Sequence, residues 1–160
     1  MNNFKIKSIQ TSDRDQITSI LKKQWGSLNI ITRNKIHQAD RLPGYIAFLD
    51  GKIAGLITYS LEKDCEIITL DSLIHGKGIS STLLEKVKEI AKEKKRKRIW
   101  LITTNDNTVA LRFYQKRGFV LSALYPNALV QSRKLKPEIP ITGIDGIPLR
   151  DEIELEIKLT

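Results

Sequence analysis

The sequence has one cysteine, only five prolines and no long apolar run, and each scarcity excludes a class of protein. Cys65 alone cannot form an internal disulfide, and no cysteine and histidine cluster has the spacing of zinc ligands. No apolar run approaches the ~18 residues that span a bilayer, and the first residues lack the apolar stretch of a secretory signal. Few prolines beside 41% hydrophobic residues argue against disorder. We therefore expect a soluble cytoplasmic protein with a packed core, no structural metal and no membrane partner.

Acidic residues are also in the minority, with 18 Asp and Glu against 27 Lys and Arg, which gives a formal net charge of +9. This balance favours a polyanionic partner, either nucleic acid or a phosphorylated small molecule. Much of the excess lies in residues 85–98, where basic residues at the end of a helix suit the helix dipole. A nucleic-acid arm more often mixes basic residues with exposed aromatics or glycines, and this run has neither. We favour a solvated helix face, with a basic nucleic-acid-binding module as an alternative.

Hydrophobic periodicity predicts one mixed α/β (α+β) domain over residues 1–160, with antiparallel strands first and a parallel β-α-β step in the middle. The expected order is β-α-α-β-β-β-α-β-α-β-β, with a long loop before the last strand. The expected strands are 4–9, 45–49, 52–59, 65–73, 99–104, 119–124 and 153–159. The expected helices are 11–23, 33–41, 79–95 and 107–116, and the long loop has room for a further short helix at 128–135. Asp50-Gly51 is suited to a type I′ turn between two of these strands.

The segment from Leu70 to Leu84 carries the strongest chemical signal, because a strand runs into a turn with Gly76 and Gly78 that opens a long amphipathic helix. The first amides of a helix lack internal partners and lie at the positive end of its dipole. Glycine lets the backbone approach a phosphate closely, so this junction predicts a pyrophosphate site. The Walker pattern fails because Ile79 follows Gly78, and the dinucleotide pattern fails because Ser81 takes the place of its third glycine.

A second segment, residues 107–119, follows the next predicted strand, and with it the sequence resembles the GNAT superfamily of acyl-CoA-dependent N-acetyltransferases. Members have a Gln/Arg-x-x-Gly-x-Gly/Ala loop and, one strand later, Asn-x-x-Ala-x-x-Phe-Tyr-x-x-x-Gly-Phe. The second pattern is matched at Asn107, Ala110, Phe113, Tyr114, Gly118 and Phe119. In the first pattern, His75 stands in place of Gln/Arg and Ser80 in place of Gly/Ala. The match is close over residues 71–120 and looser over 44–70.

The resemblance implies a mixed sheet whose fourth and fifth strands, here 65–73 and 99–104, are parallel and splay apart around acetyl-CoA. Backbone groups near Ser72 and Leu73 would pair with the pantetheine arm, and an N–H there would polarise the thioester carbonyl. Amides of residues 76–81 would hold the pyrophosphate. The cofactor-binding residues expected in this way are Ser72, Leu73, Ile74, His75, Gly76, Lys77, Gly78, Ile79, Ser80, Ser81, Asn105, Asn107, Ala110, Phe113 and Lys116.

The same resemblance implies acetyl transfer from acetyl-CoA to a primary amine, directly and within a ternary complex, with no metal. Tyr114 matches the family's proton donor to the departing thiolate. A phenol has a reference pKa of ~10 and a cysteine-type thiol one of ~8.5, so a tyrosine stays protonated at neutral pH and is able to donate a proton to the thiolate. The alternative for Tyr114 is a core aromatic beside Phe113. The base would be Glu66 or its rival Asp71, and either could instead be a solvated charge on a strand.

Several expectations stay open at this point. A non-catalytic acyl-CoA sensor is a second alternative, the amine acceptor is not identified, and homodimers are common in the family that the sequence resembles. Arg33 and His37 lie in a predicted helix that the family uses as a substrate wall, although such residues on helices are usually exposed. Asp151, Glu152 and Glu154 on the last strand could attract a cationic amine, but alternating acids on an edge strand are more often solubilising.

Overall fold

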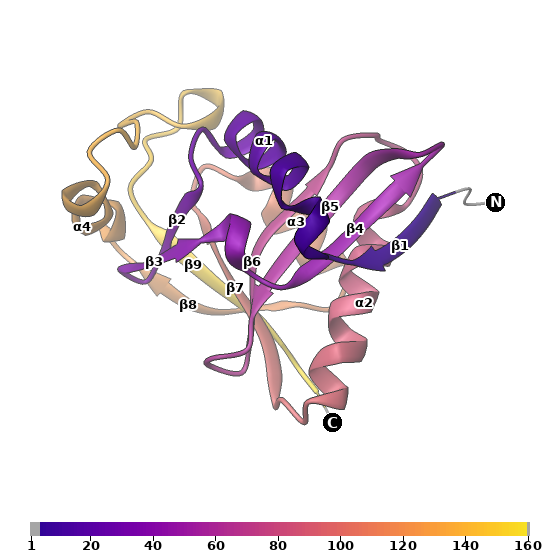
Figure 1. The fold of residues 1–160 in the computed structure, drawn as a ribbon. Coiled ribbons are helices and arrows are strands. Elements are labelled where there is room, and N and C mark those ends of the chain that lie inside the picture. Colours follow the sequence, from indigo (N-terminus) through magenta and orange to yellow (C-terminus); the bar gives the residue numbers. More distant parts are fainter. Residues whose placement is uncertain (1–3, 160) are drawn as a thin grey trace. The chain divides into compact units, whose positions relative to one another are not determined.

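The computed structural model describes residues 4–159, whose strands and helices follow one another as drawn in Figure 1. These residues form two compact units. The first comprises the chain up to Ile30, His37–Ile99 and Leu159, and the second comprises Ile31–Ile36 and Trp100–Lys158. Between residues 4 and 159, no helix has both the length and the apolar character that a membrane crossing requires.

The sheet of the first unit has four antiparallel strands in the order β1-β4-β5-β6. They are β1 (Phe4–Ser8), β4 (Gly44–Leu49), β5 (Lys52–Ser60) and β6 (Cys65–Ser72). The predicted hairpin between β4 and β5 is confirmed. Asp50 and Gly51 join these strands with φ angles of 51° and 78°, in the left-handed region that a two-residue type I′ turn requires.

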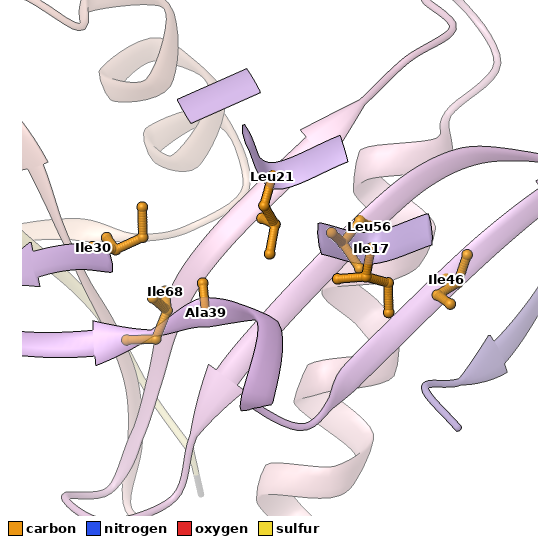
Figure 2. Packing of buried hydrophobic residues seen from close by; sticks show 7 residues of the cluster. All are labelled: Ile17, Leu21, Ile30, Ala39, Ile46, Leu56 and Ile68. Atoms are coloured by element: carbon orange, nitrogen blue, oxygen red, sulfur yellow. The ribbon is translucent and has the colours of Figure 1, made fainter. Parts of the chain in front are cut away.

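Helix α1 (Arg14–Trp25) covers one face of this sheet. Its side chains Ile17 and Leu21, one helical turn apart, are completely buried. Figure 2 shows them in an apolar cluster with residues of the strands and of the segment after the helix. The cluster consists of Ile17, Leu21, Ile30, Ala39, Ile46, Leu56 and Ile68. The helix ends at Gly26, whose φ of 72° lies in the left-handed region common at the end of a helix.

Helix α2 (Ile79–Glu93) packs on the other face, and it approaches β5 closely at Gly55. A Cβ at Gly55 would lie 2.5 Å from Cγ2 of Ile79 and 3.1 Å from Cδ1 of Leu83. The next residue, Leu56, belongs to the α1 cluster, and successive residues of a strand point to opposite faces. The missing side chain of Gly55 therefore lets the first turn of α2 lie directly against the sheet.

The helix predicted for residues 33–41 is wrong. This segment contains β3 (Lys35–Gln38), preceded by β2 (Asn29–Thr32) and followed by a 3-10 helix (Ala39–Arg41). Arg33 and Asn34, with φ angles of 46° and 62°, make the turn between β2 and β3. The β-branched run of β2 favours an extended backbone, and asparagine tolerates the left-handed region that a tight turn needs.

In the second unit, β9 (Glu152–Lys158) lies between β7 (Arg98–Thr104) and β8 (Val120–Tyr125), and it is antiparallel to β8. The unit also contains α3 (Thr108–Lys116) and α4 (Ala128–Leu135). The expectation that the last strand is an edge strand is wrong, because β9 has a neighbour on each side. The mixed α/β class and the order of elements from β4 to β9 agree with the prediction.

Candidate functional site

The glycine turn leaves β6 and forms the start of α2 in the first unit. Gly76 and Gly78 have φ angles of 79° and 72°, and Gly78 is the N-cap residue of the helix. The first bond of the helical pattern runs from the Thr82 N–H to the Gly78 carbonyl at 3.1 Å. The amides of residues 79–81 therefore precede the helical hydrogen-bond ladder, at the positive end of a 15-residue helix. Residues 75–78 are exposed, so an anion can reach this end of the helix.

The N–H of Leu73 donates to the carbonyl of Ala54 at 2.8 Å. This amide extends the β5–β6 pairing by one residue and is already engaged. If an N–H near the end of β6 polarises a thioester carbonyl, it is therefore not that of Leu73. The Ser72 hydroxyl donates to the carbonyl of Ile74 at 2.7 Å, which stabilises the bend that leads into the glycine turn.

Glu66 lies on β6 and is buried against His37 of β3. Nε2 of His37 is 3.7 Å from Oε1 of Glu66, and the two residues are only 4% and 5% exposed. The interpretation of Glu66 as a solvated strand charge is therefore wrong, as is the expectation that His37 is an exposed residue on a helix. A buried carboxylate beside an imidazole is able to accept or pass on a proton.

Asp71 lies near the end of β6, close in sequence to the glycine turn. Its Oδ2 accepts a hydrogen bond of 2.8 Å from the indole Nε1 of Trp25 on α1. Burial raises the pKa of Asp71, and the Trp25 hydrogen bond opposes this change. Asp71 is thus a partly buried carboxyl with a raised pKa, which makes it a stronger base than an exposed aspartate.

The second sequence motif forms α3 and its ends in the second unit. Tyr114 is 7% exposed, and its ring makes edge contacts with Phe113 at 5.1 Å and with Phe119 at 5.3 Å. Gly118, with a φ of 92°, lets the chain turn so that Phe119 reaches this ring. The aromatic members of the motif therefore form one cluster, which fixes the orientation of Tyr114.

The two asparagines expected to bind the cofactor also hold the backbone of this unit. Asn107 is the N-cap of α3, and its Oδ1 accepts from the Ala110 N–H at 3.1 Å. Asn105 donates from Nδ2 to the Pro148 carbonyl, and its Oδ1 accepts from the N–H groups of Arg150 and Asp151. Asn105 thus ties the end of β7 to the segment before β9, and both ends of its side-chain amide are engaged there. Lys116 is exposed at the end of α3.

The acids of β9 are buried rather than solubilising. Glu152 is 2% exposed and pairs with Arg33, whose Nη1 is 2.9 Å from its Oε1. Glu154 is 8% exposed and accepts from the hydroxyls of Ser122 and Tyr125 at 2.9 and 3.1 Å. Charge alternation in a strand was the only sequence signal, and it does not identify partners so distant in the chain. Between residues 4 and 159, no group of three His, Cys, Asp or Glu side chains is arranged to hold a metal ion.

Comparison with known proteins gives a consistent result. A model of the acetyltransferase (GNAT) family matches residues 9–119. The protein YxbD of Bacillus subtilis (strain 168) is 49% identical over 144 residues, which cover 89% of this chain and 91% of YxbD. The fold is similar to an IAA acetyltransferase from Bacillus cereus ATCC 14579, with a TM-score of 0.75 and 25% identity over 98% of this chain and 99% of that one. It is also similar to a GNAT family acetyltransferase from Elizabethkingia anophelis with acetyl-CoA bound, with a TM-score of 0.71 and 23% identity over 99% of this chain and 100% of the other.

Proposed function

The chain belongs to the acetyltransferase (GNAT) family, and from this premise we propose that it transfers an acetyl group from acetyl-CoA to a primary amine within a ternary complex. The observation that carries the proposal is the glycine turn at the start of α2. Two glycines at positive φ lead directly into the first turn of a long helix, and this segment lies within the part of the chain that the family model matches.

The residues of the turn fit a pyrophosphate. Three amides precede the helical hydrogen bonds, and the space around the missing Cβ of Gly76 is open. Lys77 lies in the same turn and supplies a positive charge, in a chain with a formal net charge of +9. We propose that the amides of residues 76–81 hold the two phosphates of CoA, and that the carbonyls near Ser72 and Leu73 accept hydrogen bonds from the pantetheine arm.

The reaction requires two proton transfers. The amine must lose a proton before its nitrogen attacks the thioester carbon, and the sulfur must gain one when the carbon–sulfur bond breaks. We propose Tyr114 as the donor to sulfur, because its ring is fixed by Phe113 and Phe119 and it matches the family's donor position. For the amine we propose one of two acids, either Asp71 with its raised pKa or Glu66, paired with the buried His37.

The proposal is tested by following thiol release from acetyl-CoA with a panel of primary amines. Tyr114→Phe removes the phenol oxygen but keeps the ring that packs on Phe113 and Phe119. We expect kcat to fall roughly 100- to 10,000-fold, the range for loss of a general acid, while the Kd for CoA is unchanged. Tyr45→Phe is the matched control, because Tyr45 stacks on Tyr59 in the first unit and has no proposed role.

Three outcomes separate the hypotheses. A normal kcat for Tyr114→Phe would remove Tyr114 from the mechanism. Binding of CoA with no turnover of any amine would favour a non-catalytic acyl-CoA sensor. Tight binding of oligonucleotides that weakens steeply with salt, with no affinity for CoA, would favour the nucleic-acid alternative.

A further inference from the structure

The second unit contains a cavity of about 430 Å³ that none of the roles above uses. It lies among the turn of the β2–β3 hairpin, the end of β8 and the start of α4, which Figure 1 shows near one another. Its polar lining comes from Arg33, Asn34, Tyr125, Asn127 and Gln131. The volume is typical of a site for a small molecule.

Arg33 is the only charged residue that lines this cavity, and the protein holds it in place. Its Nη1 lies 2.9 Å from Oε1 of Glu152, and its backbone N–H donates to the other carboxylate oxygen at 3.3 Å. The guanidinium carbon lies 3.4 Å from the ring centroid of Tyr125. The Tyr125 hydroxyl in turn contacts Glu154 at 3.1 Å. Arg33 is therefore oriented by an ion pair on one side and by an aromatic face on another.

Arg33 still has donors to offer. A guanidinium carries five N–H groups, and Nε and Nη2 of Arg33 reach no acceptor among residues 4–159. Its side chain is 36% exposed, so a ligand can reach these donors. The side-chain amides of Asn34, Asn127 and Gln131 likewise make no hydrogen bond within the described chain. The cavity thus combines a fixed cationic edge with three uncommitted amides and no acidic lining residue.

We propose that this cavity binds a carboxylate of the acceptor, so that the acceptor is a small amine that also carries a carboxylate group. The inference rests on the acetyltransferase function proposed above. The Nε and Nη2 groups of a guanidinium form two parallel donors that match the two oxygens of a carboxylate. Glu152 already offsets part of the Arg33 charge, which favours a ligand with one negative charge over a dianion such as phosphate. The amides of Asn34, Asn127 and Gln131 would bind the remaining polar atoms.

The test compares amino acids with the amines that lack only the carboxylate. Selectivity is measured as the ratio of kcat/KM for the two members of each pair. We expect the wild type to prefer the carboxylated member at least ten-fold, and Arg33→Gln to lower this ratio about 10- to 100-fold, the range for a hydrogen-bonded charge. Arg33→Lys keeps the charge but not the paired donors, so it should recover only part of the ratio. Lys134→Gln on α4 removes the same charge away from the lining and should leave the ratio unchanged.

Loss of Arg33 leaves Glu152 buried without its partner, so the double variant Arg33→Gln/Glu152→Gln is measured beside the single one. Both kcat/KM values of a pair are measured on the same preparation of a variant. A smaller folded fraction lowers both values equally, so it does not change their ratio. A ratio near one in the wild type, or the same ratio in wild type and Arg33→Gln, would overturn the inference while leaving acetyl transfer intact.

If no amine is turned over, the proposed function fails. A thermal-shift titration with the same amino acids then tests whether the cavity binds a carboxylate. The site is supported if the carboxylated compounds stabilise the wild type and Lys134→Gln but not Arg33→Gln. No stabilisation, or equal stabilisation in both variants, overturns it.

Discussion

Replacing Gly76 by alanine tests the glycine turn most directly. Gly76 has a φ of 79°, and no atom lies within 4 Å of the position that its Cβ would take. The substitution therefore strains the backbone without a clash. A residue with a Cβ in the left-handed region costs roughly 1 to 2 kcal/mol. Because 1 kcal/mol shifts the Tm of a domain of this size by roughly 2 to 4 °C, we expect the Tm to fall by roughly 2 to 8 °C.

Gly26→Ala is the matched control. Gly26 has a φ of 72°, also with no atom within 4 Å of its Cβ position, and it lies at the end of α1. Both variants should lose similar stability. Only at Gly76 would the new methyl group also stand beside the amides that we propose to hold the pyrophosphate. We expect its Kd for CoA to rise about ten-fold, equivalent to about 1.4 kcal/mol.

Calorimetric titration with CoA and thermal unfolding of both variants give the two quantities. The decisive comparison is the change in Kd at equal loss of stability. If Gly76→Ala and Gly26→Ala unfold at the same lowered temperature and both bind CoA as tightly as the wild type, the turn does not hold the phosphates. The proposed function would then lose the observation on which it depends.

Four further predictions concern the first unit. Gly55→Ala should lower the free energy of unfolding by about 1 to 3 kcal/mol, measured by chemical denaturation, because the new Cβ would lie 2.5 Å from Ile79. Asp13 accepts a backbone hydrogen bond that holds its pKa below the ordinary 3.8; the stability advantage of the wild type over Asp13→Asn should therefore be present above pH 3.8 and be lost as the pH falls through the folded pKa. Asp71 has a raised pKa, so the folded form binds its proton more readily, and the wild type should lose stability relative to Asp71→Asn as the pH rises past the ordinary value of 3.8. If Asp71 is the base, Asp71→Asn should also remove the acidic limb of the profile of kcat/KM against pH. If Glu66 is the base, Glu66→Gln should remove that limb instead.

Each of these predictions has a clear contrary result. Wild-type stability in Gly55→Ala would mean that α2 does not lie so close to β5. A stability difference for Asp13→Asn that stays constant down to the lowest pH would contradict its lowered pKa. For Asp71, a difference that grows in favour of the wild type as the pH rises would have the wrong sign. Unchanged acidic limbs in both acid variants would mean that neither residue is the base.

The parts of the fold that were predicted correctly depend on neighbours in sequence. Asp50 and Gly51 alone specify a turn with two positive φ angles, so the β4–β5 hairpin follows from the dipeptide. The apolar residues of α2 recur at helical spacing over 15 residues, long enough to distinguish a helix from a strand. The glycine turn lies between β6 and α2, and its chemistry requires only backbone amides, which any sequence with the same turn would present.

The segment at 33–41 was wrongly predicted as a helix because it has too few apolar residues for a helical period to be distinguished from that of a strand. The conformation of this segment depends on the turn at Arg33 and Asn34 and on the ion-pair partner of Arg33. That partner, Glu152, is 119 residues away in sequence. No local pattern joins the two, and the same limit applies to His37 and Glu66.

Short-range sequence patterns are sufficient to identify the family motifs and the glycine turn, and they place Tyr114 beside Phe113, because each of these features depends on residues close together in the chain. Which charges are buried depends on contacts between distant parts of the chain. Glu152 and Glu154 occupy a central strand rather than an edge, and they are stable there because Arg33, Ser122 and Tyr125 supply charge and hydrogen bonds. Alternation of acids along a strand indicates only that they share a face. Whether that face meets water or a folded partner depends on the strands that pair beside it.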